Sequence, residues 1–369
     1  MPKTTDFDYT LPEGSIAQNP LQRRDSSRLL VLNRADGTVQ HRKFSEISDY
    51  LNPGDVLVAN NSRVLPARLL GHKVETKGKV EILLLEKQDG DEWRVLAGGR
   101  NIIPGLSVQL HDKDGQDTDL VAEVVSVENG PIRRVRFNKA IEPFLNQVGH
   151  TPLPPYIHTA LADPERYQTI YAKPEGSAAA PTAGLHFSPE LLLRLRDKGV
   201  IFEEITLHVG LDTFKPVETE DAEDHSIHSE WCRITPESAE RINRAKLAGG
   251  RIVAIGTTST RVLETAALRS AGVAGPLSIM SLLDNRAAGI SACAWRPVAA
   301  YEGKTDLYIY PGFRFRAVDA MVTNFHLPKS SLVMMVSAFA TRNQILSSYR
   351  IAVEKGYRFY SFGDAMLIE

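Results

Sequence analysis

The sequence of 369 residues has only two cysteines, Cys232 and Cys293, and no long apolar segment. Two cysteines are too few for a disulfide framework, and their scarcity is typical of a reducing compartment. The most apolar stretches, around 270–283 and 330–340, are shorter than the roughly 18 residues that a membrane helix needs. Residues 1–14 carry acidic side chains and no apolar core, unlike a secretory signal. We therefore expect a cytoplasmic protein without membrane spans.

The chain also lacks an excess of positive charge. Its 43 lysines and arginines stand against 45 aspartates and glutamates, which gives a formal net charge of −2. Any binding of RNA would therefore have to come from local basic patches. The clusters that could form them are Arg23, Arg24 and Arg28; Lys73, Lys77 and Lys79; Arg133, Arg134 and Arg136; and Arg314 with Arg316. Charge alone favours an ordinary solvated surface for each.

Length and pattern together predict two domains, because the chain exceeds the size of one ordinary hydrophobic core. Between residues 63 and 150, short strand-like runs alternate with turn signals such as Asp89-Gly90 and Asp114-Gly115. The runs are Arg68–Val74, Val80–Glu86, Trp93–Ala97, Ser107–Leu110, Leu120–Val127 and Ile132–Phe137. Six short strands at this spacing predict an inserted, smaller antiparallel β-barrel domain over 63–150.

The remaining residues, 1–62 and 151–369, have the pattern of a larger α/β domain. Ser188 and Thr235 are each followed by a proline and a glutamate, which is a typical helix start. A predicted strand at 251–255 leads through a loop at 256–259 into a helix at 260–270. Further strands are predicted at 307–310, 321–324 and 357–361.

The loop 179–187 is the first candidate site, and it contains Thr182, Gly184 and His186 just before a predicted helix. Its small residues would let backbone amides approach a ligand closely, and a helix N-terminus attracts negative charge. An ordinary turn packed under the helix, with His186 half-buried, explains the same residues.

A second candidate site follows in the chain, where His208, His225, His228 and Glu230 lie within 23 residues. The spacing His225-x-x-His228 could place two imidazoles on one side of a helical turn, which suggests a metal. No cysteine pair or HExxH pattern accompanies these histidines, so we expect no metal. General acid–base catalysis, or hydrogen bonds to RNA, would use the same side chains without one.

Two junctions after predicted strands add further polar groups. Thr257 and Thr258 follow a strand at the end where α/β proteins commonly bind ligands, although a helix cap at Thr258 remains an alternative. Asn324 and His326 lie at the next junction, and Asp364 closes the last predicted strand. The residues alone therefore indicate an α/β enzyme with a polar, histidine-rich cleft for a small polar ligand.

Several strings are more specific together than any is alone. The two most distinctive are Pro181–Phe187 and Thr323–Lys329. The others are Asp6–Tyr9, Leu11-Pro12, Ile16–Gln18, Ser27–Leu32, Pro53–Asp55, Asn61–Val64, Pro66–Arg68, Pro152–Ile157, Tyr167–Thr169, His208–Gly210, Gly256–Thr258 and Tyr357–Ile368. In this order the sequence resembles, nearly end to end, the S-adenosylmethionine:tRNA ribosyltransferase-isomerase family of the queuosine pathway. Residues 88–138 match that family in character more than in motif.

Three positions depart from the pattern of the family. Asp212 stands where glycine is usual and adds a charge to a candidate site loop, which bears on the geometry of substrate binding. Ala178 replaces a valine, and Thr341 replaces a glycine that commonly follows a helix. These departures concern detail and not membership of the family.

The resemblance implies a transferase for which S-adenosylmethionine is the cosubstrate and tRNA the partner. Such enzymes transfer and isomerise the ribosyl moiety onto 7-aminomethyl-7-deazaguanine at the wobble position, giving epoxyqueuosine-tRNA, adenine and methionine. The site must remove a proton beside the sulfonium, protonate adenine, keep the attacking amine neutral and exclude water. We expect a monomer.

For this chemistry we assign catalytic roles to His186, His208, His225, His228 and Glu230. Substrate contacts are expected from Thr182, Gly184, Thr213, Phe214, Thr257, Thr258, Asn324, His326 and Asp364. Arg63, Arg68 and Lys329 are expected to contact tRNA phosphates. The extruded deazaguanine needs a carboxylate at its Watson–Crick edge, for which Glu230 and Asp364 are candidates.

Three other functions are compatible with parts of the pattern. A conventional S-adenosylmethionine-dependent tRNA methyltransferase would share the cosubstrate but release S-adenosylhomocysteine. A non-catalytic RNA-binding module could use the β-rich insertion. A metal-dependent hydrolase would use the histidines and would be sensitive to chelators.

Overall fold

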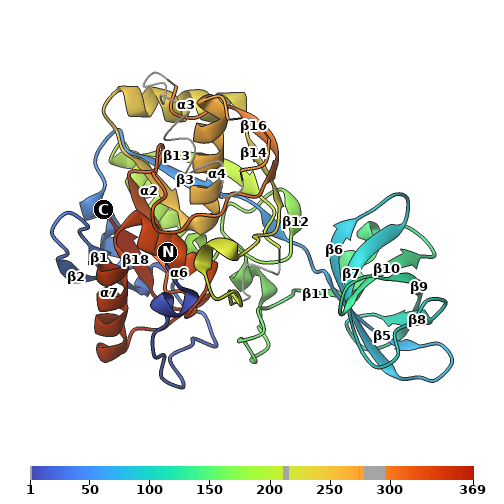
Figure 1. The fold of residues 1–369 in the computed structure, drawn as a ribbon. Helices are drawn as coiled ribbons and strands as arrows, with labels where there is room; N and C mark the ends of the chain where they lie inside the picture. The colour runs from blue at the N-terminus through green and yellow to red at the C-terminus, as the bar shows by residue number, and fades with distance from the viewer. Residues whose placement is uncertain (1, 211–215, 274, 278–295) are drawn as a thin grey trace. The chain divides into compact units, whose positions relative to one another are not determined.

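The computed structural model describes residues 2–210, 216–273, 275–277 and 296–369. The chain forms two compact units, the first made of Met1–Arg63, Pro155–Pro174 and Ala180–Glu369, the second of Val64–Pro154 and Glu175–Ala179. The first unit is a mixed α/β structure and the second a closed antiparallel barrel, so the predicted fold class is confirmed (Figure 1). None of the described helices combines the length and apolarity needed to cross a bilayer.

A nine-stranded mixed sheet is the frame of the first unit, in the order β16-β14-β13-β3-β15-β17-β18-β1-β2. Its strands are β1 (Arg28–Leu32), β2 (Val39–Lys43), β3 (Val56–Asn60), β13 (Ile201–Leu207), β14 (Glu230–Ile234), β15 (Ile252–Ile255), β16 (Tyr301–Thr305), β17 (Ala320–Asn324) and β18 (Ala365–Ile368). The neighbours β13, β3, β15 and β17 run parallel to one another. The strands β3, β15 and β17 are buried along their whole length, as parallel strands covered on both faces should be.

The helices of this unit begin largely where capping residues predict. Ser188 caps α2 (Pro189–Asp197) and Thr235 caps α3 (Pro236–Leu247), each through its side-chain oxygen. Ser330 and Thr341 do the same for α6 (Ser331–Phe339) and α7 (Arg342–Glu354). The helix α4 (Gly256–Ser270) differs, because it starts directly at the end of β15 and has no side-chain cap. The predicted loop at 256–259 is therefore wrong, and so is a capping role for Thr258.

The hydrophobic core fixes the approach to α2. Phe187, just before the helix, and Leu191, within it, are fully buried against Leu57, Val253 and Val322 of the central strands. This packing holds the short 3-10 turn Thr182–His186 against the sheet.

The second unit is a barrel of six antiparallel strands. They are β5 (Arg68–Lys73), β6 (Lys79–Lys87), β7 (Glu92–Gly98), β8 (Ser107–His111), β9 (Asp117–Val127) and β10 (Ile132–Phe137), with short β11 (Gly149–His150) added beside β5. All six predicted runs overlap these strands. Pairing of β5 with β8 closes the barrel. At this seam a Cβ on Gly71 would lie 2.3 Å from the Gln109 carbonyl oxygen, so only glycine permits the approach.

Two predicted strands of the C-terminal third are wrong. Residues 307–310 are buried but unpaired, and the side chain of Arg261 donates to the Leu307 carbonyl at 3.1 Å in place of a neighbouring strand. Residues 357–361 make only an isolated bridge at Phe359, and the last strand is β18. Their apolar pattern reflects rings packed in the core, where Phe359 contacts Phe325 and Tyr349.

Candidate active site

Polar residues gather where four parallel strands end. His208 follows β13, Ser62 lies two residues beyond β3, Thr257 follows β15 by two residues, and Asn324 ends β17. Because the carboxyl ends of parallel strands share one edge of a sheet, these segments meet there. A cavity of about 630 Å³, counting the solvent at its mouth, opens at this edge. Its walls include Tyr156, Thr182, Ala183, Val209, Thr257, Thr258, Asn324, His326 and Tyr360.

The start of α4 is shaped to receive a polar ligand. Gly256 has a φ of +87°, which lets the chain turn directly from β15 into the helix. The hydroxyls of Ser259 and Thr260 bond back to Ile255 and Gly256 carbonyls, at 2.8 and 3.1 Å. The Thr258 hydroxyl is buried at the cavity wall and has no hydrogen-bond partner among the described residues. A helix N-terminus also attracts negative charge, so this turn offers a donor-rich wall.

Asn324 organises the floor of the cavity. Its Oδ1 accepts from the Thr182 hydroxyl at 3.0 Å, and its Nδ2 donates to the Tyr360 carbonyl at 3.1 Å. The same Nδ2 lies 3.1 Å from His186 Nε2, which must accept because an amide nitrogen can only donate. His186 Nδ1 then carries the proton and donates to Ser27 Oγ at 2.8 Å.

His186 therefore lies behind Asn324, and it is not among the residues that line the cavity. Burial, assisted by the charges of Arg358 and Arg24, lowers the pKa of His186 to about 3. The imidazole is neutral at physiological pH, and its contacts orient Asn324 and Thr182.

His326 does line the cavity, together with Asn324 on the same loop. Its Nε2 lies 2.7 Å from the Thr323 hydroxyl. The Tyr9 hydroxyl donates to its carbonyl, and its backbone N–H donates to the Tyr349 hydroxyl at 3.1 Å. Burial lowers the pKa of His326 to about 3, so this imidazole is also neutral, and unlike His186 it faces the ligand space.

A buried ion network lies beside the first turn of α4. Arg261, one turn after Thr257, pairs with Glu230 Oε2. Glu230 Oε1 accepts from the Gly210 N–H at 2.7 Å and lies 3.0 Å from His228 Nε2. Burial opposes ionisation of Glu230, but Arg261, His228 and the Gly210 N–H outweigh it and hold the pKa of this carboxyl below its usual range. Glu230 is therefore an anion that holds His228.

The other two predicted catalytic histidines lie near this network. The His208 ring stacks on Trp231 with centroids 5.0 Å apart, and its Nδ1 lies 2.8 Å from Ser62 Oγ. His225 packs edge-on against Tyr308. Burial lowers the pKa of both imidazoles, with a further contribution from His228 at His225. In the described part of the chain these histidines do not bring three metal-ligand atoms together.

Two predicted substrate residues have local structural roles. A Cβ on Gly184 would lie 2.2 Å from the Tyr171 hydroxyl, so this position needs glycine for packing. Asp364 is buried and accepts from the backbone N–H groups of Arg28 and Arg358, both at 2.9 Å. Neither residue lines the cavity. Thr213, Phe214 and Asp212 lie outside the described residues.

The three predicted phosphate contacts are each paired with a carboxylate. Arg63 pairs with Glu165, Arg68 Nε lies 2.8 Å from Glu81, and Lys329 Nζ lies 3.2 Å from Asp8. Contact with a phosphate would therefore exchange one anion for another.

Sequence reasoning did not identify several residues of the site. Arg261 is the fourth residue after Thr257, and this spacing places two side chains on the same face of a helix. The spacing becomes informative only when the helix is known to begin at Gly256. Ser62, Tyr156 and Tyr360 lie within strings that carry the family resemblance, but those strings do not show which side chains reach the site. Tertiary packing places Tyr156 and Tyr360 at the cavity and Ser62 beside His208.

Comparison with known proteins agrees with the resemblance noted in the sequence. A family model described as "Queuosine biosynthesis protein" matches residues 4–368. The chain is 51% identical over 369 residues to the S-adenosylmethionine:tRNA ribosyltransferase-isomerase of Desulfitobacterium hafniense, covering 99% of each protein. It is 50% identical over 367 residues to that of Carboxydothermus hydrogenoformans, again 99% of each. The crystal structure of S-adenosylmethionine tRNA ribosyltransferase from Thermotoga maritima is 36% identical, with a TM-score of 0.53, and covers 99% of this chain and 100% of that one.

Proposed function

Because the chain belongs to the S-adenosylmethionine:tRNA ribosyltransferase-isomerase family of queuosine biosynthesis, we propose that its cavity carries out that transfer. The ribosyl part of S-adenosylmethionine is moved and isomerised onto 7-aminomethyl-7-deazaguanine at the wobble position of tRNA. Adenine and methionine leave, and epoxyqueuosine-tRNA remains. The supporting observation is the cavity at the carboxyl edge of the sheet, where the Thr258 hydroxyl, at the start of α4, has no hydrogen-bond partner in the part of the chain that the structure describes.

The donor fits the first turn of α4 in this proposal. Its carboxylate or its ribose hydroxyls would bond the Thr258 hydroxyl and the N-terminal amides of the helix. Neutral His326 suits a neighbouring position, because an imidazolium would repel the positive sulfonium. His186 acts through Asn324 as a positioning residue, since Asn324 stands between it and the ligand space.

His228 is not among the residues that line the cavity, but Glu230 joins it to Gly210, which follows the cavity residue Val209. On this ground His228 is the best candidate for the general base. The Glu230 anion beside Nε2 favours a proton on that nitrogen, which leaves Nδ1 to accept the proton beside the sulfonium. Glu230 orients and stabilises the resulting imidazolium. His208, with Ser62 at its Nδ1, is the candidate that passes a proton to departing adenine, and the proton that His228 takes from the carbon beside the sulfonium replaces it.

Both candidate carboxylates for the Watson–Crick edge of the deazaguanine already have hydrogen-bond partners. Asp364 already accepts two backbone N–H groups, and Glu230 already contacts Arg261 and Gly210. Either would have to exchange a partner to accept from the base. Glu230 is the better candidate, because Gly210 follows the cavity residue Val209.

Binding of tRNA would use Arg63, Arg68 and Lys329, released from their carboxylate partners by phosphates. A tRNA substrate also implies that the protein works in the cytoplasm. We propose that the protein acts as a monomer.

The test follows label from the ribose of S-adenosylmethionine into tRNA that carries the precursor base. The proposal expects labelled tRNA with equimolar adenine and methionine, whereas S-adenosylhomocysteine would indicate a methyltransferase. The His228→Gln variant should lose about 10²-fold or more in kcat, the usual contribution of a general base. His158→Gln, at an exposed histidine, is the matched control and should keep full activity. Equal activity of the two variants would refute the role of His228.

A further inference from the structure

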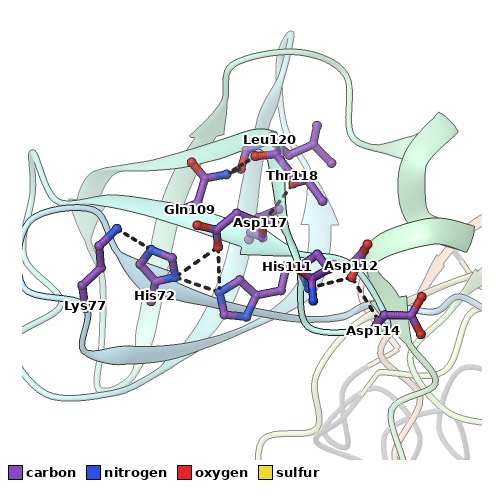
Figure 2. A network of polar contacts seen from close by, with 11 residues as sticks. His72, Lys77, Gln109, His111, Asp112, Asp114, Asp117, Thr118 and Leu120 are labelled. Carbon is purple, nitrogen blue, oxygen red and sulfur yellow. Dashed lines mark hydrogen bonds and ion pairs between the residues drawn. The ribbon is translucent and has the colours of Figure 1, made fainter.

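The barrel carries a cluster of metal-ligand side chains on the face opposite its core (Figure 2). His72 is paired with Gln109 across the β5–β8 seam, and His111 is paired with Asp117 across β8 and β9. Gln109 and His111 are two residues apart on β8, so their side chains lie on the same face of the strand. The alternate residues, Val108 and Leu110, are buried in the core. Two strand pairings and one strand alternation thus bring the histidines and the aspartate together.

The ligand atoms of this cluster lie within 4.8 Å of one another, close enough for one ion to contact all three. His72 Nδ1 lies 2.7 Å from His111 Nε2, and Asp117 Oδ1 lies 3.5 and 3.3 Å from those two nitrogens. A tetrahedral zinc ion with bonds of about 2.0–2.1 Å holds its ligand atoms roughly 3.3 Å apart. Small shifts of the rings would therefore admit an ion, with water in the fourth position.

The supporting backbone is already fixed. Asp112 Oδ1 accepts from the N–H groups of Asp114 and Gln116, at 3.0 and 2.8 Å, which holds the turn between His111 and Asp117. Gln109 donates to the Thr118 and Leu120 carbonyls across the irregular stretch of the β8–β9 pair. The site therefore needs little ordering when it binds.

In the metal-free cluster, a lysine side chain contacts one of the two histidines. Lys77 Nζ lies 2.9 Å from His72 Nε2, and an ammonium can only donate, so the proton of His72 is on Nδ1 and points at the cluster. A bound ion would take the lone pair of Nδ1, and the single ring proton would move to Nε2, so the imidazole stays neutral. Nε2 would then be a donor, and Lys77 would lose its acceptor and withdraw.

From these contacts we propose that His72, His111 and Asp117 bind a divalent ion of the zinc class. Imidazole nitrogens with one carboxylate suit zinc and cobalt(II), whereas calcium and magnesium prefer oxygen ligands alone. The ion would join β5, β8 and β9, the strands at which the barrel closes, and would stabilise that seam. The catalytic chemistry does not depend on this site.

The first test is titration of the metal-free full-length protein with Co²⁺, whose visible absorption is strong in tetrahedral N/O sites. The proposal expects one site per chain and at least tenfold weaker binding in His111→Gln and in Asp117→Asn. Asp117 is largely exposed, so the second variant keeps the fold even if the first does not. His150→Gln, at a histidine of β11 in the same unit, is the matched control and should bind like the wild type. Lys77→Met should bind about fivefold more tightly, because a competing cation is removed.

The second test uses Zn²⁺ and hydrogen exchange. Saturating Zn²⁺ should protect the amides of β5 and β8 and raise the melting temperature by about 5 °C, with both effects lost in Asp117→Asn. Absence of the cobalt absorption, or equal affinity in Asp117→Asn and His150→Gln, would overturn the proposal. Turnover of tRNA is not a readout here, so failure of this site leaves the proposed function standing.

Discussion

At the scale of single residues, the histidines divide into two kinds. His186 and His326 are buried and neutral, and each is held by a hydroxyl, an amide or both. His228 instead lies beside an anion, with its Nε2 3.0 Å from Glu230 Oε1. The sequence predicted that these residues share a site, but it could not separate the two kinds, because burial and the identity of the neighbour determine the difference.

The low pKa of His186 makes a prediction about acid stability. The unfolded chain takes up this proton near pH 6.5 while the folded protein resists it until about pH 3, so folding stability falls as the pH drops through that window. His186 alone makes the free energy of unfolding fall by about 1.4 kcal/mol for each pH unit in this window. Urea unfolding of His186→Gln between pH 5.5 and 4.5 should show a slope smaller by about that amount.

The comparison is with His158→Gln, an exposed histidine whose replacement should leave the slope unchanged. An identical slope in the wild type and in His186→Gln would mean that His186 is protonated in the folded protein.

At the scale of elements, local sequence signals predicted most of the helix starts at which a side chain caps the helix. Ser188 and Thr235 begin helices as expected, and six barrel strands appear at the predicted places. The start of α4 was missed, because the helix relies on Gly256 and the end of β15 and lacks a capping side chain. The predicted strand at 307–310 was wrong because these buried residues pair with no neighbouring strand, and the Leu307 carbonyl accepts from the Arg261 side chain instead.

The start of α4 also yields a prediction about ligand binding. Thr258→Val removes a hydroxyl that has no hydrogen-bond partner among the described residues, so folding stability should change little while the affinity for S-adenosylmethionine falls about tenfold. Thr260→Val is the matched control: its hydroxyl bonds the Gly256 carbonyl at 3.1 Å, and donor affinity should be kept. Calorimetric titration of both variants with the donor measures the difference. Undiminished binding by Thr258→Val would exclude a contact at this hydroxyl.

At the scale of the whole molecule, the site depends on the order of strands in the sheet. Residues near 60, 208, 257 and 324 are far apart in the chain, and they meet because β3, β13, β15 and β17 are parallel neighbours. Motifs could identify each loop, but strand order is a non-local property that no short string encodes. The ion pairs that occupy Arg63, Arg68 and Lys329 were invisible for the same reason.

Those ion pairs lead to a prediction about tRNA. If Lys329 contacts a phosphate, Asp8 competes with the RNA for the same ammonium, since the two lie 3.2 Å apart. Asp8→Asn should then bind tRNA several-fold more tightly, while Lys329→Asn should bind more weakly. The slope of log affinity against log salt concentration should be less steep by about 0.9 for Lys329→Asn. This difference is the value of one phosphate contact on duplex nucleic acid.

Lys246→Gln, which removes a cation paired with Asp319, controls for net charge alone. If it weakens binding as much as Lys329→Asn does, the effect is the overall field of the protein and not a contact at Lys329.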